Sequence, residues 1–276
     1  MSESPSSLSL MRGLRRVARN WYWIGPLCWM ILPSRFPPRR GLIHTRLGRR
    51  PVTVRLRSGR KLQFPPSEFW PLIEVYVLRE YQRRGIDWKS AKTVVDVGAN
   101  VGMATLWVSE MAPQARIISI EPSPSAFRWL SSNVRNNYLE DRVVSLQCAL
   151  GATPGLGQLV NDGSAAVYGR VTVADERAGA SVAVRTLESV LEEQAVSEVD
   201  VLKLDCEGAE FEILETAPTA LLGRVRAIVG EFHAWNGRRV EELAASLRSN
   251  GFDVSFDGGQ EVGFFTATRL RENPTS

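Results

Sequence analysis

The stretch Val94-Val95-Asp96-Val97-Gly98-Ala99-Asn100-Val101-Gly102 is the most informative part of this 276-residue chain. Its β-branched apolar run indicates a buried strand, and the strand carries an acid, Asp96, near its end. A glycine-spaced turn follows, and the apolar residues of 103–108 then recur with the spacing of a helix. Because glycine has no Cβ, the backbone of this turn can approach a ligand closely. The first N–H groups of the helix have no partner inside the helix, so the stretch predicts a ligand site.

A second acid lies where a nucleoside-binding unit needs one. Residues 116–120 have the pattern of a strand, and Glu121 follows them, nineteen residues after Gly102. A carboxylate in this place can accept hydrogen bonds from both hydroxyls of a ribose. Strand, glycine turn, helix, strand and acid together predict a nucleoside-binding βαβ unit.

The spacing of the glycines limits which class of nucleoside ligand can bind. A dinucleotide site usually carries G-x-G-x-x-G after its first strand, whereas this chain carries D-x-G-x-N-x-G. The acid precedes the glycines, and its negative charge would repel a pyrophosphate and favour a cationic ligand. S-adenosylmethionine (SAM) has a sulfonium, an amino group and a ribose. We therefore predict SAM as the cofactor, with a nicotinamide-dependent oxidoreductase as the alternative enzyme.

Composition and charge bound the class of protein. Hydrophobic residues make up 44% of the chain, which suits one α/β domain with additions. Residues 1–66 hold 14 lysines and arginines and one acidic residue, which gives a net charge of +13. Residues 67–276 hold 20 lysines and arginines and 29 acidic residues, which gives a net charge of −9. An acidic body with a basic arm is not typical of a nucleic-acid binder. The arm could contact an anionic surface. The three cysteines form neither a disulfide framework nor a zinc pattern, so we expect a cytoplasmic setting.

The basic N-terminal arm, residues 1–50, contains an apolar, Trp-rich stretch at residues 21–32. Twelve helical residues span roughly 18 Å, less than the about 30 Å of a bilayer core, and Pro26 interrupts a helix. We therefore reject a transmembrane span. Two interpretations remain: the tryptophans pack onto the body, or residues 12–40 make a peripheral membrane contact, with Trp at headgroup depth and Arg on anionic lipid. A non-enzymatic membrane-associated module is the corresponding non-enzyme alternative.

The pattern predicts a cap in front of a nucleotide-binding fold. Residues 1–10 are Ser-rich and expected to be disordered. Residues 51–90 form the cap, with a β-hairpin over 52–64 and a helix over 67–84. Residues 91–276 form the SAM-binding domain, in which strands and helices alternate and imply a mostly parallel sheet. The expected strands are 93–97, 116–120, 143–150, 181–185, 199–205 and 227–232; the helices are 102–111, 123–136, 187–194, 209–216 and 237–249; and an antiparallel hairpin of 252–256 and 262–268 closes the domain.

A second group of polar residues follows the fourth and fifth core strands. Asp205, Glu207 and Glu210 lie at the end of one strand and the start of the next helix, and His233 ends the following strand. Ligands of open α/β sheets bind outside the carboxyl ends of the strands, near the point where the strand order reverses. Asp96, Glu121, Asp205 and Glu207 should therefore converge on one crevice, with His233 beside it. A salt-bridged helix N-terminus is the alternative explanation for Glu207 and Glu210.

Taken together, four motifs resemble the FkbM family of SAM-dependent methyltransferases. They are Asp96-Val-Gly-Ala-Asn-Val-Gly102, Ile120-Glu-Pro-Ser123, Leu202-Lys-Leu-Asp-Cys-Glu-Gly-Ala-Glu210 and Glu231-Phe-His233, and the likeness extends more loosely to Tyr81. The resemblance implies a class I methyltransferase, Rossmann-like fold. It also implies O-methylation of a hydroxyl on a sugar, glycolipid or polyketide-like acceptor.

The resemblance also implies a cofactor site. By that likeness, the turn from Asp96 to Gly102 lines the methionine end of SAM and Glu121 binds the ribose. The residues around Cys148 and Ala149 lie beside the adenine. The complete set of expected cofactor-binding residues is Asp96, Gly98, Ala99, Asn100, Gly102, Glu121, Pro122, Cys148, Ala149, Asp205 and Glu207.

Methyl transfer to a hydroxyl needs a proton acceptor, because an alcohol is a poor nucleophile until its proton leaves. His233 is the first candidate base, since the ordinary pKa of histidine is about 6.5, and Asp205 is the second. Lys203 could orient a carboxylate or a substrate oxygen. We assign no metal site, although Asp205, Glu207, Glu231 and His233 could instead hold a divalent cation that binds the acceptor oxygen.

Nucleic acid is not expected as the substrate. Amino-group methyltransferases acting on bases usually carry an (Asp/Asn)-Pro-Pro-aromatic turn where this chain has Asp205-Cys206-Glu207-Gly208. Residues 151–181, rich in glycine, and the N-terminal cap are expected to shape the acceptor pocket.

Overall fold

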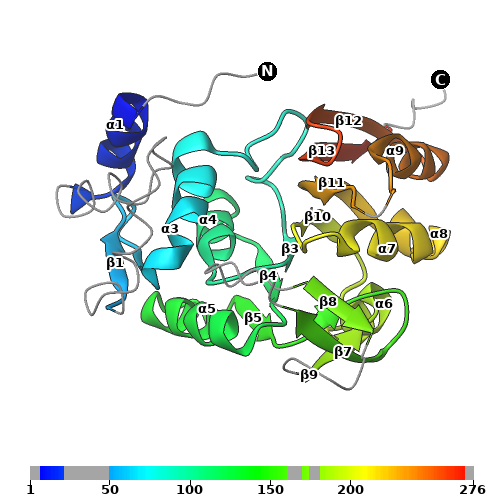
Figure 1. The fold of residues 1–276 in the computed structure, drawn as a ribbon, viewed down its shortest axis with the longest axis horizontal. Coiled ribbons are helices and arrows are strands. Elements are labelled where there is room, and N and C mark those ends of the chain that lie inside the picture. The colour runs from blue at the N-terminus through cyan, green and yellow to red at the C-terminus, as the bar shows by residue number, and fades with distance from the viewer. Residues whose placement is uncertain (1–6, 22–49, 161–169, 174–180, 236, 271–276) are drawn as a thin grey trace.

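A seven-stranded sheet forms the centre of the computed structural model, which describes residues 7–21, 50–160, 170–173, 181–235 and 237–270 (Figure 1). The strand order is β12-β13-β11-β10-β3-β4-β5. The five strands from β11 to β5 run parallel to one another, while β13 pairs antiparallel with both β11 and β12. Their bounds are β3 Thr93–Val97, β4 Arg116–Ile120, β5 Val143–Leu146, β10 Val199–Leu204, β11 Val225–His233, β12 Phe252–Gly258 and β13 Val262–Arg269. The predicted α/β fold, a mostly parallel sheet closed by an antiparallel hairpin, is confirmed.

The alternation of side chains along each strand explains why both faces of the sheet are covered. Val94 and Ile117 belong to one hydrophobic core, whereas their neighbours Val95 and Ile118 belong to a second core on the other face. Figure 1 shows α4 and α5 on the side of the N-terminal cap and α7, α8 and α9 on the opposite side. The helices are α4 Met103–Met111, α5 Pro124–Asn136, α6 Leu187–Glu193, α7 Ala209–Thr216, α8 Thr219–Gly223 and α9 Val240–Ser249.

One predicted strand is divided between two sheets. The sequence predicted a continuous strand over 143–150, but β5 ends at Leu146, and β6, Ala149–Leu150, joins a separate four-stranded sheet of order β6-β9-β7-β8. Because β4 ends at Ile120, opposite Leu146, the residues beyond Leu146 have no partner strand in the main sheet. They pair with β9 instead. The other strands of the small sheet are β7 Gly155–Val160, β8 Arg170–Val173 and β9 Ser181–Arg185.

The cap consists of a hairpin and a short, irregular helical segment. Strands β1, Val52–Arg55, and β2, Lys61–Phe64, form the predicted hairpin. The single helix predicted over 67–84 is wrong in length and regularity. It is a 3₁₀ turn η3, Pro66–Glu68, followed by α3, Phe69–Leu72, and a π-helix η4, Ile73–Leu78. Arg79 ends it in the left-handed region, with φ 58°. This early stop turns the chain so that the Tyr81 hydroxyl reaches Asp205, a tertiary contact that overrides local helix propensity.

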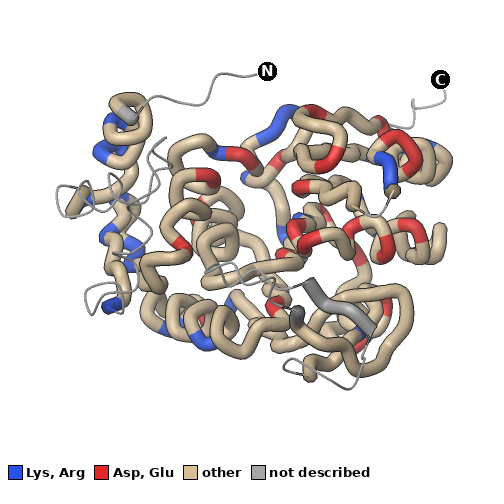
Figure 2. The backbone as a smooth tube through the Cα atoms, in the orientation of Figure 1, with Lys and Arg blue, Asp and Glu red and all other residues tan. Residues whose placement is uncertain are grey.

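The disorder predicted for residues 1–10 is wrong for residues 7–10, which begin helix α1, Ser7–Val17. Its apolar side packs on the cap through Leu10 and Leu14, both buried, and backbone hydrogen bonds join Arg19 to Arg55 and Arg57 to Val17. The arginines of α1 are exposed, and Figure 2 shows basic residues gathered on α1 and the hairpin. Trp21 packs partly buried against the core, whereas the rest of the predicted Trp-rich stretch lies outside the described residues.

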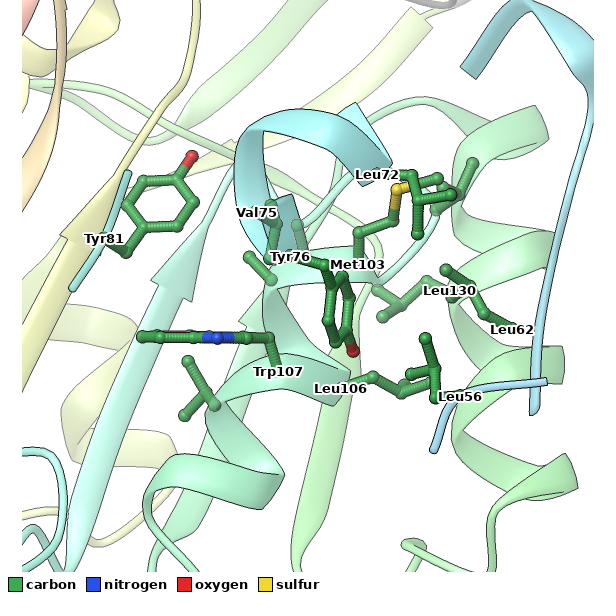
Figure 3. Close-up of a cluster of buried hydrophobic side chains, with 14 of the residues drawn as sticks. Leu56, Leu62, Leu72, Val75, Tyr76, Tyr81, Met103, Leu106, Trp107 and Leu130 are labelled. Carbon is green, nitrogen blue, oxygen red and sulfur yellow. The ribbon is translucent and has the colours of Figure 1, made fainter. Parts of the chain in front are cut away.

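The cap and the nucleotide-binding fold share one core. Side chains from the hairpin, the cap helix, α4 and α5 meet in a single hydrophobic cluster (Figure 3). Asn133, wholly buried on α5, accepts a hydrogen bond from Gln63 N and donates to Gln63 O and Val101 O. Asn137 makes the corresponding pair with Lys61. The cap is therefore fixed against the glycine turn. Within the described residues, no helix combines the length and apolar character needed to cross a bilayer.

Candidate functional site

A cavity of about 360 Å³ opens at the carboxyl ends of β3, β4, β10 and β11. The order of the strands reverses between β3 and β10, which is where open α/β sheets bind ligands. The structure brings most predicted site residues to this cavity. The lining residues that the sequence predicted are Gly98, Ala99, Asn100, Glu121, Pro122, Cys148, Ala149, Lys203, Asp205, Glu207 and His233. Asp96 and Gly102 are not among the lining residues.

The glycine turn takes its shape from close backbone packing. Gly98 has φ +72°, and a Cβ placed there would lie 1.6 Å from the carbonyl oxygen of Asp205. Only glycine therefore allows the β3 turn and the end of β10 to meet at the cavity. Gly102 begins α4 with φ +89°, and a Cβ there would lie 2.9 Å from Leu130 Cδ1. Its role is to let α4 pack on α5, which explains why it does not line the cavity.

Glu121 faces the glycine turn from the end of β4. Its Oε2 accepts a hydrogen bond from Asn100 N at 2.8 Å and its Oε1 accepts one from Ser123 N at 2.7 Å. Burial raises the pKa of this carboxyl to about 7, although the two backbone hydrogen bonds oppose the shift. Each carboxylate oxygen keeps a second lone pair. The group can therefore accept further hydrogen bonds from a ligand in the cavity.

Asn100 connects the turn to the cap. Its Nδ2 donates to Glu68 Oε2 at 2.7 Å, and Glu68 is wholly buried in η3. Asn100 Oδ1 is buried and has no hydrogen-bond partner among the described residues. A buried acceptor of this kind is costly unless a donor satisfies it. Together with the open glycine turn and Glu121, it fits a ligand that brings both a donor and a ribose, as SAM does.

Asp96 and Lys203 form a buried ion pair beneath the cavity floor. Lys203 Nζ lies 3.0 Å from Asp96 Oδ1, and the two side chains are 1% and 0% exposed. Asp96 also accepts a hydrogen bond from Thr105 Oγ1 at 2.6 Å. Lys203 donates to the carbonyl oxygen of Gly98 at 2.9 Å. The side chain expected to touch the cofactor is thus buried, and it supports the glycine turn through Lys203.

Asp205 lies at the junction of the turn, the cap and the cavity. Its Oδ2 accepts a hydrogen bond from the Tyr81 hydroxyl at 2.7 Å and lies 3.8 Å from Lys203 Nζ. Tyr81 is buried, and its ring packs edge-on against Phe264. The cap therefore sets the orientation of Asp205.

His233 and Glu231 share one face of β11, because side chains two residues apart in a strand point the same way. His233 Nδ1 lies 3.3 Å from Glu210 Oε1, and its Nε2 lies 3.7 Å from Glu207 and 3.9 Å from Glu231. Burial lowers the pKa of His233, but the hydrogen bond and charge of Glu210 and the charges of Glu207 and Asp205 outweigh it, and the pKa rises to about 9.

The outer part of the cavity is strongly acidic. Burial, together with repulsion from Glu80, Asp205 and Glu231, raises the pKa of Glu74 to about 9. Burial and the charge of Asp205 raise the pKa of Glu231 to about 8. Carboxyl groups with pKa values raised in this way hold their protons at neutral pH, and a cation bound beside them would favour their ionised form.

The sequence predicted that the cap helps to shape the acceptor pocket, but it identified none of the cap residues that line the cavity. Trp70, Glu74 and Val75 line the cavity. The available signal was Glu74, an acid within an otherwise apolar run, since such a residue is seldom buried without a role. Glu210 was assigned no site role, yet it is wholly buried and holds His233.

Residues 96–254 match the methyltransferase FkbM domain. Methyltransferase sdnD of Sordaria araneosa is 33% identical over 195 residues, which are 59% of this chain and 74% of that protein. The 31-O-demethyl-FK506 methyltransferase FkbM of Streptomyces tacrolimicus is 26% identical over 66% of this chain and 80% of its own length. Among solved structures, the human methyltransferase 10 domain containing protein aligns with a TM-score of 0.46 at 15% identity, over 78% of this chain and 90% of that chain.

Proposed function

The chain belongs to the FkbM family of methyltransferases, whose cofactor is SAM, and we propose that it transfers the methyl group to a hydroxyl oxygen of a small-molecule acceptor. One observation carries the proposal. A single cavity joins the glycine turn and Glu121 on one side to the acidic group around Asp205 and His233 on the other. The first side suits a nucleoside and the second suits a hydroxyl that must lose a proton.

On the cofactor side, Glu121 would accept hydrogen bonds from the ribose hydroxyls. Asn100 Oδ1, which has no partner among the described residues, is available to a bound donor. Cys148 and Ala149 line the cavity after β5, where the adenine is expected. SAM supplies an activated methyl group on a sulfonium, so the residues of the chain mainly hold and orient the two reactants.

On the acceptor side, the acceptor oxygen attacks the methyl carbon in line with the carbon–sulfur bond. The carbon–oxygen bond forms as the carbon–sulfur bond breaks, the electron pair stays on sulfur, and S-adenosylhomocysteine leaves. The hydroxyl proton passes to a base: Asp205 is the candidate at neutral pH, whereas His233, with its pKa raised to about 9, could accept the proton only at higher pH. A positioned base contributes about 10²–10⁴-fold to such a rate.

The class of acceptor rests on two further observations. The cavity is about 360 Å³ and is lined in part by Trp70 and Val75 of the cap, which suits a compact organic molecule. One relative is named for methyl transfer at an oxygen of FK506. We therefore propose a sugar, glycolipid or polyketide-like acceptor and no nucleic acid. A nicotinamide-dependent oxidoreductase is not retained, because the family is one of methyltransferases.

The proposal is tested with SAM carrying a deuterated methyl group, incubated with the protein and panels of hydroxyl-bearing glycosides and polyketides. Mass spectrometry should show the labelled methyl on one panel member. The same compound with its hydroxyl replaced by hydrogen should gain no label. Methylation only at nitrogen or carbon across matched panels would refute O-methylation while leaving methyl transfer intact.

We add to this proposal an electrostatic contact between the N-terminal arm and anionic membrane lipid. Arg12, Arg15 and Arg16 are exposed on α1, while the apolar side of that helix packs on the cap. We therefore expect α1 to be attracted to the anionic membrane surface by its arginines without inserting into the bilayer. The protein should sediment with vesicles containing phosphatidylserine and not with neutral vesicles, and moderate salt should release it. Equal binding to both vesicle types, or to neither, would contradict the contact.

A further inference from the structure

We infer that Asp205, Glu231 and His233 form a binding site for one divalent cation of the magnesium and manganese class. One ligand atom from each of the three residues lies within 4.8 Å of the others. Two ligands of such an ion, each about 2.1 Å from it, are about 3.0 Å apart when adjacent and about 4.2 Å apart when opposite. Small rotations of the three side chains would therefore close the cluster around an ion. The chemical role of this ion rests on the proposed function, whereas its geometry does not.

The backbone explains why these three residues meet. Asp205 directly follows β10, and β10 and β11 are neighbouring parallel strands. Glu231 and His233 are two residues apart at the end of β11, so both side chains leave the strand on the cavity side. The side chains of Asp205 and Glu231 are 28% and 25% exposed, which leaves them open to an ion entering from the cavity.

Glu210, a buried carboxylate behind the cluster, orients His233. His233 is 6% exposed, and Glu210, wholly buried, holds its Nδ1. Glu210 is itself fixed, because its carboxylate accepts hydrogen bonds from Cys206 N at 2.6 Å and Gly208 N at 2.9 Å. With Nδ1 occupied, Nε2 points toward the carboxylates and makes no hydrogen bond to any described residue. A carboxylate on one nitrogen that leaves the other free is the usual arrangement of a metal-binding histidine.

A second outer contact orients the aspartate. The Tyr81 hydroxyl donates to Asp205 Oδ2 at 2.7 Å and so restrains the rotation of this carboxylate. Lys203 contributes one positive charge beneath the floor, but it lies 3.0 Å from Asp96 and 3.8 Å from Asp205, so its charge is shared between two acids. Lys203 therefore leaves part of the negative charge of Asp205 available to a cation in the cavity.

The ligand set indicates the kind of ion. Two carboxylates and one imidazole combine the oxygen ligands that Mg²⁺ and Mn²⁺ prefer with a nitrogen that Mn²⁺ also accepts. Three protein ligands leave about three positions of an octahedral ion for water or for the acceptor. An acceptor hydroxyl bound there would lose its proton more readily, because the ion stabilises the oxygen anion. Asp205 and His233 would then act as ligands, and Glu207, which lines the same cavity, would receive the proton.

Titration of the full-length, metal-stripped protein with Mn²⁺, followed by electron paramagnetic resonance, tests the site. Wild type should bind one Mn²⁺ per chain. Glu231→Gln, which keeps the shape of a partly exposed side chain, should weaken Mn²⁺ binding by at least tenfold. Glu210→Gln should weaken it by about 10–100-fold through the histidine. Glu212→Gln is the matched control, since Glu212 lines the same cavity outside the cluster, and its Mn²⁺ affinity should equal that of wild type.

Failure of the metal site is distinguishable from failure of the cofactor assignment. S-adenosylhomocysteine binding, measured by calorimetry in the presence of EDTA, reports the cofactor side alone. The inference would be overturned if wild type bound no Mn²⁺ at millimolar concentration, either with S-adenosylhomocysteine bound or without it. Equal affinity in wild type and Glu231→Gln would overturn it too, because the ion would then lie elsewhere.

Discussion

Lys203 and Asp96 are direct neighbours in the register of β10 and β3, and they form an ion pair of 3.0 Å with almost no exposed surface. The same ammonium group donates to the carbonyl oxygen of Gly98 in the turn that opens on the cavity. A pair of charges inside the sheet thus fixes the turn that we propose receives the cofactor. The shape of the cavity therefore depends on a contact between two strands inside the sheet.

Lys203→Met should destabilise the protein by about 3–5 kcal/mol, since removing one partner leaves a buried charge uncompensated. Urea unfolding followed by circular dichroism measures the change. Glu198→Gln is the control, because Glu198 pairs with Arg226 at 2.7 Å on the surface, with side chains 63% and 66% exposed. That pair should contribute less than about 1 kcal/mol. Similar losses of unfolding free energy in the two variants would show that the buried ion pair stabilises the protein no more than the exposed pair does.

The sheet and the positions of the site residues could be predicted because they follow from local pattern. A parallel strand buried on both faces is a short apolar run, and an acid directly after it lies at the edge where ligands bind. Glu121, Asp205 and His233 were placed in this way, and all three line the cavity.

What could not be predicted depends on contacts between distant residues. The direction of the Asp96 side chain is set by Lys203 in the neighbouring strand, 107 positions away in the chain. Tyr81 meets Asp205 only because η4 ends early, and local propensity favoured a longer helix. The break after Leu146 arises because β4 has already ended. In each case a tertiary contact overrides the local signal.

Gly98→Ala should lower stability and abolish binding of S-adenosylhomocysteine, because the added Cβ would lie 1.6 Å from a backbone oxygen of Asp205. Gly59→Ala separates this clash from backbone strain. Gly59 also has a positive φ, +100°, but a Cβ there meets nothing within 4 Å. Gly59→Ala should therefore lower the free energy of unfolding only by the about 1–2 kcal/mol that an alanine with a left-handed backbone costs. Thermal unfolding and calorimetry should therefore show a larger loss, and lost binding, only for Gly98→Ala.

Asn133→Ala should loosen the cap from the nucleotide-binding fold. The substitution leaves Gln63 N, Gln63 O and Val101 O without this partner, at about 1–3 kcal/mol for each group that stays buried and unpaired. Hydrogen exchange should rise in the hairpin and in the glycine turn together. Asn136→Ala is the neighbouring control, since its bonds are exposed. Faster exchange confined to α5 would argue that the cap is not held through Asn133.

Affinity for S-adenosylhomocysteine should fall as the pH drops below about 7. Burial raises the pKa of Glu121 to about 7, so the carboxyl is protonated at lower pH and loses acceptor capacity toward the ribose hydroxyls. If only the carboxylate binds, the dissociation constant rises up to about tenfold for each pH unit below that value. Calorimetry between pH 5.5 and 8 measures this slope. Glu121→Gln should bind at least tenfold more weakly than wild type at pH 8, with a flat profile over the same range. A wild-type profile that is equally flat would show that the carboxylate does not receive the ribose.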